Sequence, residues 1–268
     1  MELEKLLQSW LKAVRDHDFT GADGLYTQIV SRAPLYQGIH YPMGVWYKEL
    51  GFNDKAFAAF QRALRSDPQI RADTYYYLGN VTRNQNKFND AAAFYQKALE
   101  VDPDFFEAHY NLGKVYEMLG KNDKALKHFQ KALQLNPDDA DTYVNLGVGF
   151  SNAGLKEKAL EMYERALALD PQSYLVYSNM GVEYAELGDF RKAISFHKKA
   201  LELNSFYGDA WYNLGCTFAL AGDYSNALSS LEKAFKLDEE NIKYAENDPE
   251  LGELRQTRDY RRLLKTDG

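Results

Sequence analysis

The chain has 268 residues, of which 39 are acidic and 32 are Lys or Arg, so its formal net charge at pH 7 is −7. This length predicts one or two globular domains, and the acidic balance argues against nucleic acid as a partner, because phosphate binding needs a basic surface. A lone cysteine, Cys216, excludes an intrachain disulfide framework, and there is neither a signal-peptide-like apolar run at the start nor the roughly 18 apolar residues of a membrane helix.

Small residues and prolines recur along the chain at an interval of 34 residues. Five glycines keep this interval, at Gly79, Gly113, Gly147, Gly181 and Gly215. Two series of alanines, which start at Ala91 and Ala98, keep it as well. Four prolines follow it, with one extra residue between the first two, at Pro68, Pro103, Pro137 and Pro171. Because several residue classes share one phase, the chain is predicted to be an array of repeats.

Each repeat is expected to fold as two amphipathic helices. In residues 106–139, Leu112 and Tyr116 fall on one face of a first helix, and Gly120 ends that helix. A second helix ends before Pro137, because a proline disfavours helical geometry in the residue that precedes it. A glycine or alanine at the contact points lets the two helices approach closely, and a large ring fills the space beyond it.

This pattern resembles that of the tetratricopeptide repeat (TPR) family, W-x2-L-G-x2-Y followed by A-x3-F, A and P. The best match is Trp211-x2-Leu214-Gly215-x2-Phe218. Clear TPR repeats cover 37–71, 72–105, 106–139, 140–173, 174–207 and 208–241. The resemblance implies an all-α fold, a right-handed superhelical solenoid of tandem helix-turn-helix repeats.

The two ends depart from this pattern. Residues 3–36 keep Ala22, Tyr26 and Pro34 in register but lack the Leu-Gly pair, so we interpret them as a degenerate TPR, as terminal repeats are often atypical. Residues 242–268 leave the register and are expected to form C-terminal capping helices. The whole chain, 1–268, is thus expected to be a single TPR domain.

The outward face of the first helices is the candidate binding surface. At about 100° per residue, position 6 of each first helix points away from its own second helix, and in the family this face lines the concave groove. Position 6 is an asparagine in four consecutive repeats, at Asn111, Asn145, Asn179 and Asn213. A primary amide carries a donor and an acceptor side by side, which matches a peptide backbone. The same asparagine is common in the family's consensus, where it can equally satisfy only local groups or water.

Further residues on this face would give side-chain selectivity to a bound peptide. They are aromatic or polar, and aromatic side chains are frequent hot spots of binding; they are Tyr76, Asn80, Tyr110, Lys114 and Tyr212. The alternative is that the tyrosines only cover adjacent helices. A carboxylate clamp of the kind that binds heat-shock chaperones is not expected, because its three cations are missing here.

No catalytic constellation is found in the sequence. The five histidines form neither an HExxH motif nor a Cys/His zinc pattern, so no metal and no cofactor are expected. Three of them, His40, His109 and His197, occupy positions where an aromatic core residue is expected, which favours core packing. Cys216 is interpreted as a small apolar side chain.

These observations predict a cytoplasmic, non-enzymatic scaffold or adaptor that binds an extended peptide segment of a partner protein in its concave groove. The alternative is a self-assembling structural scaffold that uses its groove or end repeats for homo-oligomerisation. RNA binding is a third hypothesis, against which the acidic charge speaks. Neither nucleic-acid binding nor membrane insertion is expected.

Overall fold

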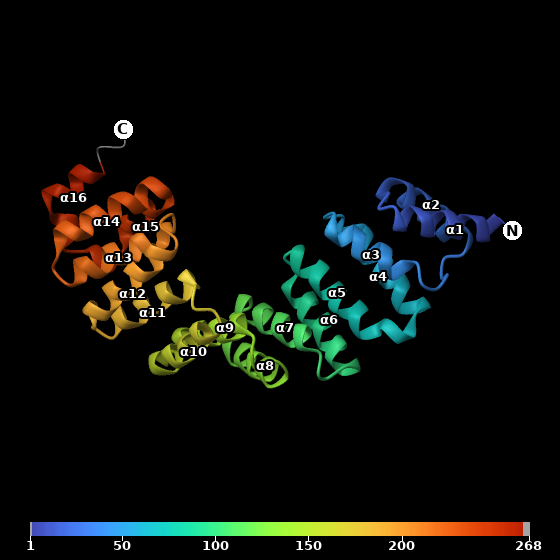
Figure 1. The fold of residues 1–268 in the computed structure, drawn as a ribbon, viewed down its shortest axis with the longest axis horizontal. Coiled ribbons are helices and arrows are strands. Elements are labelled where there is room, and N and C mark those ends of the chain that lie inside the picture. The colour runs from blue at the N-terminus through green and yellow to red at the C-terminus, as the bar shows by residue number, and fades with distance from the viewer. Residues whose placement is uncertain (1, 265–268) are drawn as a thin grey trace. The chain divides into compact units, whose positions relative to one another are not determined.

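The computed structural model describes residues 2–264, and within them it contains sixteen α-helices, three short 3-10 helices and no strand (Figure 1). The predicted all-α fold of tandem helix pairs is confirmed. None of the described helices is long and apolar enough to cross a membrane. The chain divides into two compact units, which we call the N-terminal unit, up to Pro137, and the C-terminal unit, from Asp138 on.

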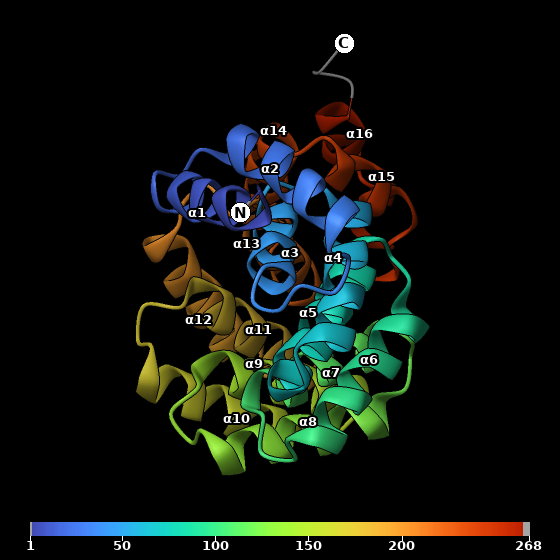
Figure 2. The ribbon, with the colours of Figure 1, turned by 90° about the vertical axis from the view of Figure 1, so that its right-hand side faces the viewer.

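The N-terminal unit consists of four helix pairs and one 3-10 turn. Its elements are α1 (Glu2–Arg15), α2 (Phe19–Arg32), α3 (His40–Glu49), α4 (Asn53–Ser66), η1 (Pro68–Ile70), α5 (Arg71–Asn84), α6 (Phe88–Val101), α7 (Phe106–Met118) and α8 (Asn122–Leu135). Each first helix packs against the second helix of its own pair, and from α5 on also against the second helix of the preceding pair (Figure 2).

The C-terminal unit consists of three helix pairs followed by a tail of short helices. The pairs are α9 (Ala140–Asn152) with α10 (Lys156–Leu169), α11 (Tyr174–Glu186) with α12 (Phe190–Leu203), and α13 (Gly208–Leu220) with α14 (Tyr224–Leu237). The tail comprises α15 (Glu240–Asn247), η2 (Pro249–Leu251), η3 (Leu254–Gln256) and α16 (Arg258–Leu263). Its buried residues Leu251, Leu254 and Tyr260 join the core of the last helix pair.

A glycine opposite a ring explains why the 34-residue period works. A Cβ atom added at Gly113 in α7 would lie 2.6 Å from the ring of Phe129 in α8, so only glycine lets the ring touch the first helix. Gly181 and His197 repeat this contact, at 2.5 Å, in the C-terminal unit. The close approach buries the rings of both second helices completely.

A residue with positive φ ends most of the first helices. Gly120, which follows α7, has a φ of +67°, a conformation that favours glycine because it lacks a Cβ atom. After α5 the same place is taken by Asn86, with a φ of +59°, and asparagine is among the few other residues that tolerate this geometry. The turn within each pair is therefore encoded locally.

Candidate functional site

The N-terminal unit engages the amide of Asn111 in hydrogen bonds of its own. Asn111 lies on α7 and is only 8% exposed. The Arg83 guanidinium of α5 donates to its Oδ1 across 2.9 Å, and its Nδ2 donates to the hydroxyl of Tyr76 across 3.1 Å. The acceptor and one donor of this amide are therefore used between neighbouring repeats, which favours the local role for Asn111.

Asn80 has a similar place on α5. It is 6% exposed, and its Oδ1 accepts a hydrogen bond of 2.7 Å from the hydroxyl of Tyr95 on α6. Burial raises the pKa of Tyr95, so the phenol remains a donor at neutral pH. Asn80 thus joins the two helices of its repeat.

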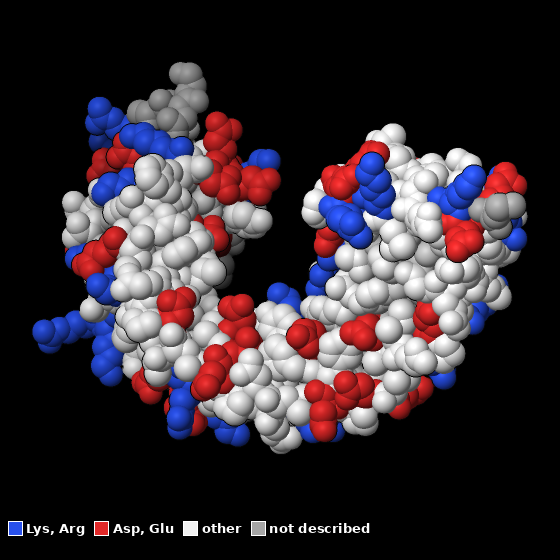
Figure 3. Space-filling view, turned by 45° about the vertical axis from the view of Figure 1, so that its right-hand side comes forward, with Lys and Arg blue, Asp and Glu red and all other residues white. Residues whose placement is uncertain are grey.

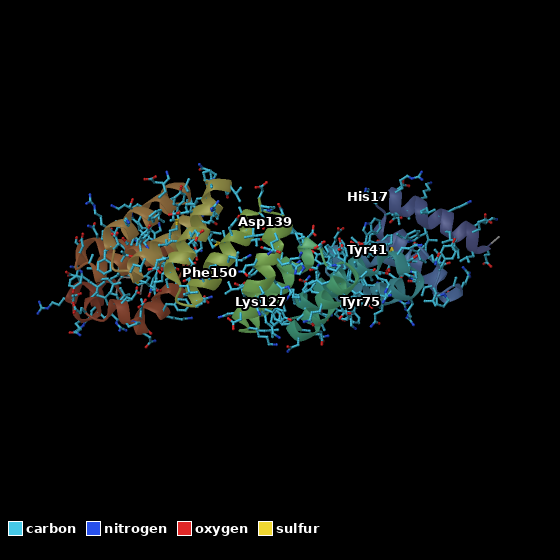
Figure 4. The ribbon with its side chains drawn as sticks, turned by 90° about the horizontal axis from the view of Figure 1, so that it is seen from below. His17, Tyr41, Tyr75, Lys127, Asp139 and Phe150 are labelled. Atoms are coloured by element: carbon cyan, nitrogen blue, oxygen red, sulfur yellow. The ribbon has the colours of Figure 1, made fainter. Side chains whose placement is uncertain are left out.

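Tyrosine rings on α3, α5 and α7 pack against one another and against neighbouring helices. The ring of Tyr76 lies 5.4 Å from that of Tyr77 and 5.1 Å from that of Phe105, between centroids. The rings of Tyr110 and Phe129 are 6.1 Å apart, and the ammonium of Lys114 lies 5.8 Å from the centre of the Tyr110 ring. Figure 4 labels two further tyrosines of this unit, on α3 and α5. These contacts favour the interpretation that the tyrosines cover adjacent helices, although each stays partly exposed.

The C-terminal unit leaves its position-6 amides without such partners. Asn145 on α9, Asn179 on α11 and Asn213 on α13 are each partly exposed. In the described part of the chain, their side chains make no hydrogen bond with the protein. Since α11 contacts both α9 and α13, the three asparagines stand on adjacent first helices. Donors and acceptors are therefore available on one face of this unit.

Small side chains surround these amides. Val144 and Val148 on α9 and Val182 on α11 are partly exposed, and Ser178 is buried. The three valines are short, so a main chain can approach the amides beside them closely, while Asp141 and Leu175, one helical turn before Asn145 and Asn179, are exposed on the same face. The repeats 72–105 and 106–139 of the N-terminal unit have tyrosines, an asparagine and a lysine at the corresponding positions.

The tail covers part of this face on α13. The hydroxyl of Tyr212 donates to Oδ2 of Asp248 across 2.6 Å, and the thiol of Cys216 lies 3.6 Å from the same oxygen. Cys216 is only 3% exposed, and Asp248, which follows α15, lies against it. Burial is the main reason that the pKa of this thiol is raised, which makes it unreactive. This contact was not predicted from the sequence. The one feature that could have indicated it is the break in register at Asn247-Asp248-Pro249.

Acidic groups gather near this contact. Sγ of Cys216 and one carboxylate oxygen each of Asp248 and Glu250 lie within 4.8 Å of one another. Burial, and then Asp248, raises the pKa of Glu250. Acidic clusters of this kind are common without a cation, and this one is not assigned a metal. In the view of Figure 3, both acidic and basic side chains lie on the surface of each unit.

One carboxyl group is buried without a full set of partners. Glu183 on α11 is 2% exposed, and its Oε2 atom has no hydrogen-bond partner among the described residues. Burial raises its pKa, while a hydrogen bond with Ser151 of α9 opposes this. Lys156 forms an ion pair with Glu186 nearby rather than with Glu183. In the sequence, Glu183 resembles an ordinary surface residue, and nothing there indicates that it is buried.

Family models match a large part of the sequence. A TPR repeat model matches residues 79–120, and tetratricopeptide repeat models match 106–139, 140–173 and 175–240. Together they cover more than half of the chain. No curated protein was found that matches the sequence.

Solved structures share the fold. The chain is 28% identical to YrrB, described as a TPR protein with an unusual peptide-binding site, with a TM-score of 0.57 over 70% of this chain and 97% of that one. It is 27% identical to MamA, with a TM-score of 0.56 over 62% of this chain and 98% of that one. The C-terminal part of a TPR repeat-containing protein from Cytophaga hutchinsonii gives a TM-score of 0.71 over 88% of this chain and 98% of that one, at 17% identity, which shows the fold alone.

Proposed function

The chain belongs to the tetratricopeptide repeat family, and from that premise we propose that it binds an extended segment of a partner protein along α9 and α11. The fold and its relatives support a protein-interaction scaffold. The segment would be held by its main chain on Asn145 and Asn179. YrrB, a relative described as peptide-binding, supports this mode of action.

The observation that carries the proposal is the pair of amides without partners on α9 and α11. A partly buried amide with open donors and acceptors must be satisfied by water or by a ligand. Neighbouring first helices pack about 8–10 Å apart, and an extended chain advances about 3.3 Å per residue. The two amides would therefore meet main-chain groups about three residues apart.

The valines next to the amides limit which side chains a ligand can place there. Val144, Val148 and Val182 give an apolar lining, so side chains of the ligand that contact them would be small and apolar. This lining offers no cation to a terminal carboxylate. A segment from the interior of a partner chain fits the site better than a C-terminus.

The proposed site ends at α13. Asn213 is the fourth asparagine at position 6, but Tyr212, the residue before it on α13, donates its hydroxyl hydrogen to Asp248 of the tail. A ligand that reached Asn213 would have to displace this tail contact. In the N-terminal unit, Tyr110 and Lys114 are proposed to add a separate, side-chain-selective surface, and the bound amides of Asn80 and Asn111 are not proposed to contact a ligand.

The test uses peptides selected on the protein itself. A displayed library of random 12-residue peptides is selected on the wild type, and the selected peptides are titrated calorimetrically into the wild type and the double variant Asn145→Ala/Asn179→Ala. Two lost hydrogen bonds of about 1 kcal/mol each predict a loss of affinity of roughly 30-fold. The matched control, Gln130→Ala/Gln134→Ala, removes two exposed amides from α8 and should bind like the wild type.

A second arm tests whether the main chain is recognised. N-methylation of single peptide bonds in a selected peptide removes one donor at a time, and binding should fall at two sites about three residues apart. Equal affinity of the wild type and the double variant would contradict the proposal. If no peptide is selected and the mass in light scattering rises with concentration, self-assembly replaces it.

A further inference from the structure

Two histidines on the paired helices α7 and α8 face each other through ring nitrogens. Nδ1 of His109 and Nδ1 of His128 are 3.0 Å apart, and the ring centroids are 5.2 Å apart. From this geometry we propose that the pair binds one divalent transition-metal ion, of the Zn²⁺ or Cu²⁺ type, in the N-terminal unit. Imidazole nitrogen is a preferred ligand of these ions.

The ring of His109 is oriented as in a metal ligand. Its Nε2 atom lies 3.0 Å from the carbonyl oxygen of Pro103. When Nε2 donates its proton to this carbonyl, Nδ1 of the neutral ring carries a lone pair toward His128. Histidines that bind metals usually donate their other N–H group to a carbonyl or carboxylate in this way, which fixes the tautomer and the ring. This arrangement exists here before any ion is bound.

The ring of His128 is held as well. It packs against the ring of Tyr116 with centroids 5.5 Å apart, and the hydroxyl of Tyr116 accepts a hydrogen bond of 2.8 Å from the side chain of Gln96. His128 is partly exposed, whereas His109 is buried. An ion can therefore approach the pair from the side of His128.

The two Nδ1 atoms are nearly as far apart as two nitrogen ligands of one ion. Zinc–nitrogen bonds of about 2.0–2.1 Å at a tetrahedral angle separate two ligand nitrogens by roughly 3.3 Å. The observed 3.0 Å has to widen by about 0.3 Å, and because the rings face each other head-on, with centroids 5.2 Å apart, both rings also have to tilt so that the two Nδ1 atoms point at the ion. The ion would take the place of the proton between the two Nδ1 atoms, and His128 would carry that proton on Nε2 instead, so that both rings bind as neutral imidazoles.

A surface hollow beside the pair leaves room for the remaining ligands. It has a volume of about 480 Å³ and is lined by Gln96, Leu99, Glu100, Pro103 and the two histidines. Water would complete the coordination, and Glu100 is the carboxylate among the lining residues. Nearby positive charge opposes binding, but Lys131 is paired with Asp104 across 2.9 Å, and the ammonium of Lys124 lies over the ring of Tyr116.

The consequence of binding would be a clamp between α7 and α8. Both ligands lie within one helix pair, so an ion bound only by the folded chain would stabilise that pair by mass action. The His109–His128 site lies apart from the amides on α9 and α11 and does not depend on the proposed peptide binding. On α8, His128 directly follows Lys127, which Figure 4 labels.

The test titrates ZnCl₂ into tag-free, chelator-treated protein by calorimetry. The wild type should bind one ion saturably, and zinc should raise its unfolding temperature. His128→Phe keeps a ring against Tyr116 and should weaken binding at least 10-fold and abolish the temperature shift. The control His17→Asn changes an exposed histidine at a positive φ, which asparagine tolerates, and should behave like the wild type.

A second variant separates this site from the thiol and carboxylates of the tail. Cys216→Ser should keep the full affinity for zinc and the full shift of the unfolding temperature. Nitrogen NMR should show a zinc-dependent shift at Nδ1 of both histidines. The proposal is overturned if zinc binds wild type and His128→Phe equally, if it binds neither, or if Cys216→Ser alone removes binding.

Discussion

The two units place an asparagine at the same repeat position and give it different environments. The side chain of Asn111 bonds Arg83 and Tyr76 of the preceding repeat, whereas the side chain of Asn179 makes no hydrogen bond within the described chain. One repeat before Asn179, the places of Tyr76 and Arg83 are taken by Val144 and Ser151. Valine has no polar group for the amide, and serine is too short to replace the guanidinium. The residues of the preceding repeat therefore explain why the amide of Asn111 is structural and that of Asn179 is available.

The side chain of the second helix that packs on the glycine of the first helix also differs between the units. In the N-terminal unit it is that of Phe60, Tyr95 or Phe129, and in the C-terminal unit that of Tyr163, His197 or Leu231. His197 is fully buried, and neither of its ring nitrogens has a hydrogen-bond partner among the described residues. At this repeated contact, the C-terminal unit thus carries a polar ring without hydrogen-bond partners, whereas the Tyr95 hydroxyl of the N-terminal unit is bonded to Asn80.

The largest expected effect comes from making this position of the C-terminal unit resemble the N-terminal one. His197→Phe removes two buried, unsatisfied nitrogens and should raise the free energy of unfolding by about 1–3 kcal/mol at pH 7. Phe fits, because Phe129 makes the same contact with Gly113. Urea unfolding measures the change, and the reverse variant Phe129→His should destabilise the protein. A destabilised His197→Phe would show that the ring has partners after all.

The same variant should flatten the pH dependence of stability. Burial lowers the pKa of His197 to about 4, while the unfolded chain titrates near 6.5. Between these values the unfolded state binds more protons, so stability falls as the pH is lowered from 7 to 5, by about 2 kcal/mol for this group. His40 and His128 add to this fall in both proteins. Unfolding at both pH values should therefore show a smaller loss in His197→Phe than in the wild type.

The next prediction tests the difference between the asparagines directly. Asn111→Ala leaves the guanidinium of Arg83 and the hydroxyl of Tyr76 without this partner and should cost about 1–3 kcal/mol. Asn179→Ala breaks no internal bond and should cost less than about 0.5 kcal/mol. Urea unfolding of both variants measures this. Equal costs would mean that Asn179 has a structural role as well.

The sequence predicted the helix pairs because their determinants are local and periodic. Gly113 and Phe129 lie in one repeat, and the contact between them recurs every 34 residues, so spacing alone reveals it. The bond between Arg83 and Asn111 crosses repeats, and could be found only by comparing positions 5, 6 and 12 of successive repeats. Asp248 lies outside the period, and nothing in the pattern indicates which helix it contacts. The sequence therefore predicted which repeat positions form the candidate site, but not which of their side chains are engaged in hydrogen bonds.

A smaller effect is expected from transferring the structural environment to the C-terminal unit. Val144→Tyr places a hydroxyl where Tyr76 meets Asn111, and should engage the Nδ2 donor of Asn179. Val144→Phe has nearly the same size without the hydroxyl and is the control. Selected peptides should bind Val144→Tyr about threefold more weakly than Val144→Phe, a difference of under 1 kcal/mol. Equal affinities would separate Asn179 from peptide binding.

The smallest effect concerns the contact that closes the C-terminal unit on α13. Tyr212→Phe removes the hydroxyl that donates to Asp248, so the tail should open more often and expose the single thiol of the chain, Cys216. A loss of about 1 kcal/mol in local stability predicts roughly fivefold faster labelling by a maleimide at pH 7.

Tyr224→Phe is the control for this last experiment, because its hydroxyl bonds Glu253 of the same tail, away from Cys216. Its labelling rate should equal that of the wild type. Loss of the Tyr212 hydroxyl would also raise the pKa of the thiol, since the presence of this hydroxyl lowers it. That change slows labelling, so faster labelling of Tyr212→Phe can come only from opening of the tail. Unchanged or slower labelling would mean that packing of Leu251 and Leu254, rather than the Asp248 bond, holds the tail on α13.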